Sequence, residues 1–499
     1  MILQDVIKGI QVKNNPNISD KDIFITGIAD NSKEVKSGYI FVAVSGYSSD
    51  GHDYIEHAVS FGASIVIGEK EIDNLEIPYL QVDNSRRALG IIAKNYYNDP
   101  SSKKIMIGIT GTNGKTTTSF MLQQILEKNG ITCSVIGTIY NIINGKKLVS
   151  ENTTPGSIKL NSLLHSSKDQ VVIMEVSSHG LAQYRLEGIK FDYCIFTNLY
   201  HEHLDFHGSM DEYFLAKSLL FEKLKPCGFA IINGDNHWGM KLYKILQERE
   251  ITTYLVGTSN SNDLIITTYE SAKNPFILLT EEDQSVEIKL PIPGLYNLYN
   301  AALAYSTARF MSIQKESILS ALNSFPGVPG RFEIYRHDLG PTFVVDYAHT
   351  ADAFEFILQT VKKCGAKRII HIFGFRGGRD LTKRAEMVEV SSKISDYYIL
   401  TIDDLNNEKV NEMFHMMENL TSKNSPEKGL IILDRTLAIQ TAQQMGKTGD
   451  WIVITGKGPE QYKQPFVLPT NTDKETVLYV QGQFEKELRR NLSFNQQQV

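Results

Sequence analysis

A glycine-rich segment that follows an apolar run has the residue types of a phosphate-binding loop. Residues 110–118 read Thr-Gly-Thr-Asn-Gly-Lys-Thr-Thr-Thr, directly after the apolar run 104–109. Glycines let the backbone approach phosphate oxygens, and a helix that starts near Thr116 turns the positive end of its dipole towards them. Lys115 is suited to neutralise the β- and γ-phosphates, and Thr116 to ligate Mg²⁺. The spacing predicts an ATP site made by Gly111, Thr112, Asn113, Gly114, Lys115 and Thr116.

The loop is a shortened variant of the common P-loop pattern. That pattern places a further glycine where this chain has Ile109, so the segment reads Gly-Thr-x-Gly-Lys-Thr. The alternative interpretation is a glycine-rich turn that carries a surface lysine. We favour the phosphate-binding loop, because strand, loop and helix occur in the order that this function requires.

Two further apolar runs, 171–176 and 191–198, each end in polar residues. Runs of this kind are typical of buried parallel strands. Ligands of open α/β sheets bind beyond the carboxyl ends of such strands. We therefore expect Glu175 and the segment after Asn198 to face the phosphate-binding loop.

Residues 201–207 bring three histidines and two carboxylates together, a composition that a zinc site would also have. An ATP loop in the same region favours Mg²⁺ instead, which prefers oxygen ligands and keeps several waters. For His201 and His207 we favour polar loop residues without a metal. Lys217 lies in a helical pattern over 212–221, where a lone lysine is usually a surface residue whose stem packs on apolar neighbours.

The composition restricts the class of protein. With 499 residues and 42% hydrophobic residues, the chain is expected to form about three domains. The net charge is −6 without a basic block, which argues against a nucleic-acid partner. Four scattered cysteines suit buried, structural thiols in a reducing compartment. No signal peptide and no run of roughly 18–20 apolar residues occurs, so we expect a cytoplasmic protein without membrane insertion.

Turn residues divide the chain into segments. Residues 1–100 alternate short apolar runs with glycine and aspartate turns, which predicts a small α/β domain. Prolines and glycines over 325–331 break any helix begun at Lys315, and strand-like runs resume after them. The boundaries predict domains over 1–100, 101–331 and 332–499.

Short motifs spread over nearly the whole chain form a specific combination. They are Asn31-Ser32-Lys33, Asp50-Gly51-His52-Asp53, the loop at 110–118, Asn152-Thr153-Thr154-Pro155, Glu175-Val176-Ser177-Ser178-His179-Gly180-Leu181, the segment 198–221, Gly294-Leu295-Tyr296-Asn297-Leu298-Tyr299-Asn300, Gly330-Arg331, Asp346-Tyr347-Ala348-His349 and Gly456-Lys457-Gly458-Pro459-Glu460. Together they resemble the Mur ligases, and within that family the MurE type, the UDP-N-acetylmuramoyl-dipeptide:amino-acid ligases.

The resemblance implies an α/β fold of three domains, with a central P-loop parallel-sheet ATPase domain and a Rossmann-like C-terminal domain. It also implies that Lys217 is carbamylated, which turns an ammonium into an anionic oxygen ligand. The implied metal ligands are Thr116, Glu175, His203 and carbamylated Lys217, and the implied catalytic residues are Lys115, Lys217 and His203. The implied nucleotide contacts are Asn297, Asn300 and Arg331, with Asp346 and His349 near the site when the C-terminal domain closes.

The implied reaction joins UDP-N-acetylmuramoyl-L-Ala-D-Glu to a free amino acid through an acyl phosphate, with ATP and Mg²⁺, in peptidoglycan precursor synthesis. The three domains then bind the UDP substrate, ATP and the amino acid, in chain order. Arg185 suits a carboxylate because its planar fork can make two parallel hydrogen bonds. The implied substrate-binding residues are Ser32, Asn152, Thr153, Thr154, Ser177, Gln183, Arg185, Arg379, Asp403, Asp404, Gly456 and Glu460. We expect a monomer.

The chain departs from the family where the amino acid should bind. Members that add meso-diaminopimelate carry Asp-Asn-Pro-Arg, whose arginine pairs with the distal carboxylate, whereas this chain reads Asp403-Asp404-Leu405-Asn406. Two carboxylates favour a cationic side chain, so L-lysine or another diamino acid is expected in preference to diaminopimelate. The family's Gly-Gly-Asp-Arg-Asp segment reads Arg376-Gly377-Gly378-Arg379-Asp380, and Pro459 replaces a histidine.

Three alternatives follow from these departures. A divergent paralogue that joins a different amino acid or acceptor, in secondary metabolism, fits changes confined to the amino-acid site beside an intact ATP loop. A non-catalytic nucleotide-binding or scaffold protein is disfavoured by the intact metal and phosphate residues. A folylpolyglutamate- or cyanophycin-type ligase shares the ATP loop, but it does not explain residues 152–155 together with the Ser32 region.

Overall fold

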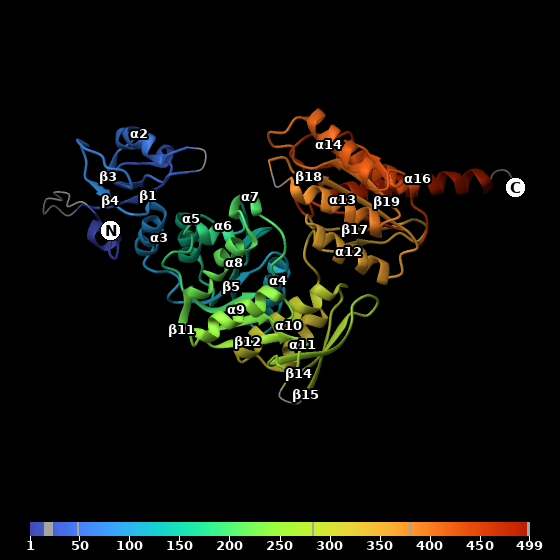
Figure 1. Ribbon diagram of the computed structural model, residues 1–499, viewed down its shortest axis with the longest axis horizontal. Coiled ribbons are helices and arrows are strands. Elements are labelled where there is room, and N and C mark those ends of the chain that lie inside the picture. The colour runs from blue at the N-terminus through green and yellow to red at the C-terminus, as the bar shows by residue number, and fades with distance from the viewer. Residues whose placement is uncertain (14–22, 47–48, 282–283, 379–380, 497–499) are drawn as a thin grey trace.

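The computed structural model describes residues 1–13, 23–46, 49–281, 284–378 and 381–496. Their strands form three separate sheets, of four, eleven and six strands. Figure 1 shows the four-stranded and six-stranded sheets apart from each other, with the eleven-stranded sheet between them and lower in the view.

The N-terminal sheet is small and parallel, in the order β1-β2-β3-β4. Its interior is filled by aliphatic side chains such as Ile40, Ile65 and Ile67, which suit a pleated, buried surface. The elements are α1 Leu3–Val6, β1 Gly27–Ala29, η1 Ser32–Glu34, β2 Tyr39–Val42, η2 Gly51–Tyr54, α2 Ile55–Ser60, β3 Ala63–Gly68, β4 Tyr79–Gln81 and α3 Ser85–Tyr96.

The central sheet has the order β15-β14-β13-β12-β11-β10-β5-β9-β6-β7-β8. The strands from β13 to β6 are parallel, and antiparallel pairs extend both edges. The strands are β5 Ile105–Thr110, β6 Cys133–Ile136, β7 Tyr140–Ile143, β8 Lys146–Val149, β9 Val171–Glu175, β10 Phe191–Phe196, β11 Leu224–Asn233, β12 Thr253–Gly257, β13 Leu264–Glu270, β14 Phe276–Glu281 and β15 Gln284–Lys289.

Helices cover both faces of this sheet. Alternate residues of β5 point to opposite faces, so Ile107 and Ile109 pack with α4, α10 and α11, whereas Met106 packs with the helices of the other face. The helices are α4 Lys115–Lys128, α5 Ser157–Ser166, α6 Ser178–Ala182, α7 Leu204–His207, α8 Met210–Ser218, η3 Phe221–Lys223, α9 His237–Glu248, α10 Leu295–Phe310 and α11 Lys315–Asn323.

The C-terminal sheet has the order β16-β17-β21-β18-β19-β20, and all its neighbours except β16 and β17 are parallel. The elements are β16 Glu333–Tyr335, β17 Thr342–Val345, α12 Ala351–Lys363, β18 Ile369–Phe375, α13 Thr382–Ile394, β19 Tyr397–Ile402, α14 Val410–Lys423, β20 Gly429–Ile431, α15 Arg435–Met445, β21 Trp451–Ile454 and α16 Asp473–Gln496.

The predicted fold class is confirmed, and the runs predicted as buried parallel strands form β9 and β10 on either side of β5. The prediction of four buried thiols is wrong for Cys227, which is exposed, while Cys133 and Cys194 are buried. Across the described parts of the chain, every helix is too short or too polar to traverse a bilayer.

Candidate active site

The glycine-rich loop connects β5 to α4 at the carboxyl edge of the central sheet. Its backbone is bound to the segment that follows the neighbouring strand β10, since the amide of Thr112 donates to the carbonyl of Asn198 at 3.0 Å and the amide of Asn113 to Oδ1 of Asn198 at 2.9 Å. The helix α4 begins at Lys115, so its N-terminus and dipole point into the loop.

Both glycines of the loop occupy conformations that other residues rarely adopt. Gly111 has φ of +146° and Gly114 has φ of +90°. A Cβ at Gly111 would lie 1.9 Å from Oγ1 of Thr197, and a Cβ at Gly114 would lie 2.4 Å from Oδ1 of Asn300. The loop therefore needs glycine at both positions for two independent reasons, backbone conformation and close packing.

The Gly114→Ala substitution is expected to weaken ATP binding at least about tenfold and to lower the free energy of unfolding by roughly 1–3 kcal/mol, because strain and collision combine. Calorimetric titration with ATP and denaturant unfolding measure the two effects. Gly130→Ala is the matched control, since Gly130 has φ of +72° and open space around its Cβ position. Equal losses of ATP affinity in both variants would contradict the role of Asn300 packing.

Lys115 is folded back onto its own loop. Its Nζ donates to the carbonyls of Gly111 at 2.8 Å and Thr112 at 2.9 Å. Burial lowers the pKa of Lys115, and the carboxylates of Glu175 and Glu202 oppose this effect. The ammonium thus lies at the phosphate-binding loop, with loop carbonyls in the place of anionic ligand oxygens.

Oxygen atoms that could ligate a metal lie close together beside the loop. Oγ1 of Thr116 donates to Oε2 of Glu175 at 2.8 Å, and Oγ1 of Thr138 donates to the same oxygen at 2.8 Å. Glu175 is fully buried at the end of β9. Mg²⁺ favours carboxylate and hydroxyl oxygens of this kind, so Thr116 and Glu175 fit the ligand set that the sequence predicts.

Lys217 is a buried residue, which is unusual for a lysine. Its side chain on α8 is 1% exposed, its Nζ donates to the carbonyl of Gly111 at 3.0 Å, and it lies 4.6 Å from the centre of the Tyr213 ring. Burial, and then the nearby charge of Lys115, lower its pKa well below the usual range. An uncharged amine is the form that reacts with carbon dioxide, so the environment suits the predicted carbamate.

His203 precedes α7 in a left-handed backbone conformation, with φ of +58°. Burial lowers its pKa to about 4, although Glu202 opposes the shift, so the imidazole is neutral at pH 7. A neutral imidazole can ligate a metal. Among the described residues, no three His, Cys, Asp or Glu side chains gather as a metal site. His207, predicted as a polar loop residue without a metal, is instead the last residue of α7, and it pairs with Oγ of Ser178 at 3.0 Å.

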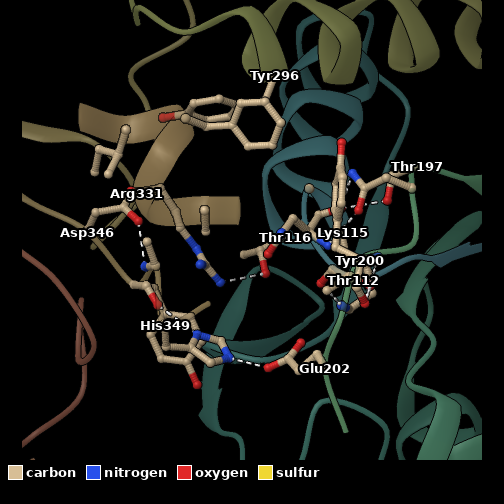
Figure 2. A pocket seen from close by; sticks show the side chains of 18 of the residues that line it. Thr112, Lys115, Thr116, Thr197, Tyr200, Glu202, Tyr296, Arg331, Asp346 and His349 are labelled. Carbon is tan, nitrogen blue, oxygen red and sulfur yellow. Dashed lines mark hydrogen bonds and ion pairs between the residues drawn. The ribbon is translucent and has the colours of Figure 1, made fainter. Parts of the chain in front are cut away.

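The central part of the chain meets the C-terminal part and the boundary segment before it at the site. Oε1 of Glu202 lies 2.6 Å from Nε2 of His349, and Nη2 of Arg331, the last residue before the C-terminal part, donates to Oγ1 of Thr116 at 3.4 Å. Figure 2 shows both contacts, with Glu202 and Thr116 on the central side and His349 and Arg331 opposite. Arg331 also stacks 4.4 Å above the ring of Tyr347. The Glu202 contact was not predicted, because it depends on how the two sheets are placed.

A cavity of about 490 Å³ lies between these walls and contains many of the predicted ATP residues. Three of its nitrogen atoms are buried and find no hydrogen-bond partner in the part of the chain that the structure describes, namely Nδ2 of Asn113, Nδ2 of Asn300 and Nε of Arg331. Buried donors normally have partners, so these atoms fit a ligand that supplies acceptors. The predicted residues that line the cavity are Thr112, Asn113, Gly114, Lys115, Thr116, Thr153, His203, Asn297, Asn300, Arg331 and Asp403.

Four predicted substrate residues form one hydrogen-bonded cluster beside Glu175. Nη1 of Arg185 donates to the carbonyl of Thr154 at 2.7 Å, and its Nη2 donates to Oε1 of Gln183 at 2.8 Å. The amide of Ser177 donates to Oγ1 of Thr154 at 2.9 Å. The neighbouring Thr153 pairs with Thr138, which reaches Glu175. Asn152 is exposed next to this cluster, and Ser32 is buried in η1 of the N-terminal part, away from the cavity lining.

The predicted amino-acid residues lie at the carboxyl ends of β19 and β21. Asp403 and Asp404 are buried, and Nζ of Lys457 donates to both, at 3.0 and 2.7 Å. Gly456 and Glu460 flank Lys457 and both contact Arg376. Arg379 lies outside the described residues. The structure therefore removes the reason for predicting a cationic substrate side chain, since the carboxylates of Asp403 and Asp404 already bind a cation of the chain.

The fold and the site define a P-loop enzyme whose cavity is shared by two sheets. Profiles of the Mur ligase middle domain, the Mur ligase glutamate ligase domain and the Mur ligase family catalytic domain match residues 109–308, 330–458 and 24–97. A protein of Alkaliphilus oremlandii, named UDP-N-acetylmuramoyl-L-alanyl-D-glutamate--2,6-diaminopimelate ligase, is 38% identical over 92% of this chain and 94% of its own length. A ligase of the same name from Clostridium botulinum is 38% identical over 87% of this chain and 90% of its own.

Solved structures agree with the sequence comparison. A structure described as a diaminopimelate ligase of the same name superposes with a TM-score of 0.67 at 26% identity, over 98% of this chain and 99% of that one. A MurF ligase of Thermotoga maritima in complex with ADP shares the fold, with a TM-score of 0.64 at 22% identity over 94% of this chain and all of that one. The chain belongs to the Mur ligase family, and it is an ATP-dependent ligase that forms ADP.

Proposed function

We propose that this enzyme joins an amino acid to UDP-N-acetylmuramoyl-L-Ala-D-Glu in peptidoglycan precursor synthesis. The observation that carries the proposal is a chain of hydrogen bonds that starts at the phosphate-binding loop. It runs through Thr116, Glu175 and Thr138 to the cluster of Thr154 and Arg185. A dipeptide bound at that cluster would have its carboxylate beside the γ-phosphate of ATP. The names of the relatives support the same nucleotide substrate.

In the proposed first step, the terminal carboxylate of the dipeptide attacks the γ-phosphorus of ATP. An acyl phosphate forms and ADP leaves, so two anions must approach each other. Lys115 would turn from its loop carbonyls to the phosphates, and Arg331 would hold the nucleotide from the opposite wall. Mg²⁺, when held by Thr116, Glu175, His203 and the Lys217 carbamate, supplies further positive charge to the same region.

In the proposed second step, the neutral amine of the incoming amino acid attacks the acyl carbon, and phosphate leaves from a tetrahedral intermediate. The amine must approach from the C-terminal wall, where Tyr347 and His349 line the cavity. Closure of the two walls around the reactants would exclude water and hold the amine at attack distance. The acyl phosphate is thereby protected from hydrolysis.

The Lys217 carbamate would form without a further catalyst. The neutral amine bonds to the carbon of CO₂, and a proton leaves the nitrogen, so an anionic oxygen pair replaces an amine. The burial and lowered pKa of Lys217 support this modification.

We also propose the N-terminal, central and C-terminal domains over 1–100, 101–331 and 332–499 as the binding sites of the UDP substrate, ATP and the amino acid. The three sheets lie within these ranges. A cytoplasmic monomer stays a prediction. The preference for L-lysine or another diamino acid over diaminopimelate is an expectation from the sequence that this proposal does not retain, because its electrostatic reason is lost with the pairing of Asp403 and Asp404.

The Arg185→Ala variant is expected to raise the KM for the UDP-muramoyl-dipeptide at least about tenfold, because it removes a charged, bidentate donor. The KM for ATP should change less than about twofold, since Arg185 does not line the ATP cavity. Steady-state kinetics with each substrate varied in turn measure the difference. Arg87→Ala is the control, an exposed arginine that pairs with Glu187 near the same part of the molecule. An equal rise in both KM values would contradict a substrate role for Arg185.

The proposed function is tested by ADP release from ATP and Mg²⁺ with UDP-N-acetylmuramoyl-L-Ala-D-Glu, with amino acids added singly. ADP release that needs both the UDP-muramoyl-dipeptide and an amino acid supports the proposal.

The second candidate is a divergent paralogue that joins a different amino acid or acceptor, and the changed residues at 376–380 and 403–406 favour it. Growth rescue of a strain that lacks its MurE-type ligase would exclude the paralogue.

A further inference from the structure

Arg376 follows β18 directly, at a position where the family pattern has a glycine, and its guanidinium lies in the predicted amino-acid region. Its Nη2 donates to a carboxylate oxygen of Glu460 and, at 3.4 Å, to the carbonyl of Gly456. Its Nε lies 3.5 Å from Oδ2 of Asp403. The guanidinium is 5.7 Å from the centre of the Tyr347 ring, and the residue lines the cavity that holds the ATP residues.

Among the described residues, carboxylates and cations around Arg376 occur in equal number. Three carboxylates, those of Asp403, Asp404 and Glu460, face three cations, those of Arg376, Lys457 and Lys463. The side chains of Asp403 and Asp404 are each only 2% exposed. Each of these three carboxylates thus has a cationic partner among the described residues, although Oδ2 of Asp404, 3.0 Å from Nζ of Lys463, accepts no hydrogen bond from them. A second ammonium group from a substrate would therefore compete with a cation that is already in place.

The side-chain ammonium of a diamino acid that entered this region would have to displace Arg376 or lie beside it. Displacement separates a guanidinium from two carboxylates in a largely buried place, and close approach sets two positive charges together. Arginine stays protonated under all ordinary conditions, so its charge cannot be removed to make room. Nη1 of Arg376 makes no hydrogen bond to any described residue, and the side chain is 22% exposed towards the cavity. A neutral or anionic group can therefore approach it.

We propose that Arg376 selects the incoming amino acid, because it takes the place of a substrate ammonium between Asp403 and Glu460. The enzyme accordingly accepts an amino acid whose side chain is neutral or acidic, and it rejects L-lysine, L-ornithine and meso-diaminopimelate. This inference rests on the proposed ligase function. It assigns to the enzyme a different class of amino-acid substrate from the 2,6-diaminopimelate in the names of the relatives.

The test compares kcat/KM for ADP release with L-alanine, L-serine, L-glutamine and L-glutamate against L-lysine, L-ornithine and meso-diaminopimelate. The wild-type enzyme should prefer an amino acid of the first group by about a hundredfold or more, as expected for an unfavourable charge contact in a closed site. Arg376→Ala should shift this ratio towards the diamino acids at least about tenfold. Arg376→Lys keeps the positive charge and should keep the preference. Arg249→Ala removes an exposed arginine that pairs with Glu222, and should leave the ratio unchanged.

Two further measurements separate the inference from the proposed function. Hydroxylamine traps an acyl phosphate as a hydroxamate, so its formation with UDP-N-acetylmuramoyl-L-Ala-D-Glu and ATP reports the first step without an amino acid. Absence of hydroxamate would contradict the proposed function. Hydroxamate formation with coupling only to diamino acids, or to no amino acid of the first group, would overturn the selection by Arg376. Calorimetric binding of L-lysine and L-glutamate to wild-type enzyme and Arg376→Ala tests the same selection without turnover, and tighter binding of L-lysine to wild type would also overturn it.

Discussion

Replacement of Lys217 by alanine is expected to lower kcat at least about a thousandfold, because the site then loses the carbamate oxygens that help to hold the metal. Lys217 is buried on α8, next to the loop at Gly111, and its amine is held in an environment that lowers its pKa. Removal of CO₂ from the wild-type enzyme should lower activity in the same direction, and added bicarbonate should restore it. Phosphate-release kinetics measure the loss.

The loss of activity must be separated from a loss of folding. Lys217→Met keeps most of the side-chain volume, so its free energy of unfolding should stay within about 1.5 kcal/mol of wild type while its activity falls as in the alanine variant. Lys241→Ala, which removes a partly exposed lysine that pairs with Asp211 and lies over the rings of Phe214 and Trp238, is the matched control with normal activity. A carbamate carbon signal from ¹³C-labelled CO₂ that is present in wild type and absent in Lys217→Met identifies the modified residue. Turnover of the alanine variant within about twofold of wild type would rule out the carbamate.

Replacement of Lys115 by methionine is expected to lower kcat/KM for ATP by about 10²–10³, the usual effect of removing one preorganised donor from a developing charge. The free energy of unfolding should change little or rise. In the absence of ATP the Lys115 ammonium is partly buried among loop carbonyls, and this partial desolvation lowers its pKa, so methionine removes a charge whose desolvation is unfavourable.

Lys128→Met at the other end of α4 is the control, because Lys128 is exposed and contacts Ser324 away from the loop. Initial-rate kinetics and thermal unfolding without ligand give the two quantities. A fall in stability as large as the fall in transition-state stabilisation would show that Lys115 is mainly structural. A catalytic loss without a fall in stability would support its role at the phosphates.

The sequence predicted those parts of the fold whose structure depends on residues that are close together in the chain. The loop between β5 and α4 was predictable because Gly111 and Gly114 are required by backbone conformation, and such requirements act within a few residues. The strands β9 and β10 were predictable because buried parallel strands have nearly continuous apolar runs. The antiparallel edges of the central sheet carry weaker, partly polar patterns, so the sequence interpretation did not include β14 and β15.

The site was predictable only where its residues belong to motifs. Lys217 was assigned by family resemblance, whereas the sequence pattern alone suggested a surface lysine. The pairing of Asp403 and Asp404 was missed because their partner Lys457 lies 54 and 53 residues away, and no local pattern reports such a contact. Arg331 and Thr116 meet across 215 residues, and Glu202 and His349 across 147 residues. These contacts depend on the placement of one sheet against another.

The contact of Glu202 with His349 connects the two walls of the cavity, and this connection has a thermodynamic consequence for ligand binding. A ligand that draws the two walls together stabilises the half of the site that it does not touch, so nucleotide and amino acid must each change the affinity of the other by the same factor. The effect should weaken when one of these contacts is removed, as in His349→Ala, while the contact of Arg331 with Thr116 remains. The enzyme is thus expected to bind ATP more tightly when the amino acid is bound, and the amino acid more tightly when ATP is bound. ATP would then be consumed mainly when the amino acid is present.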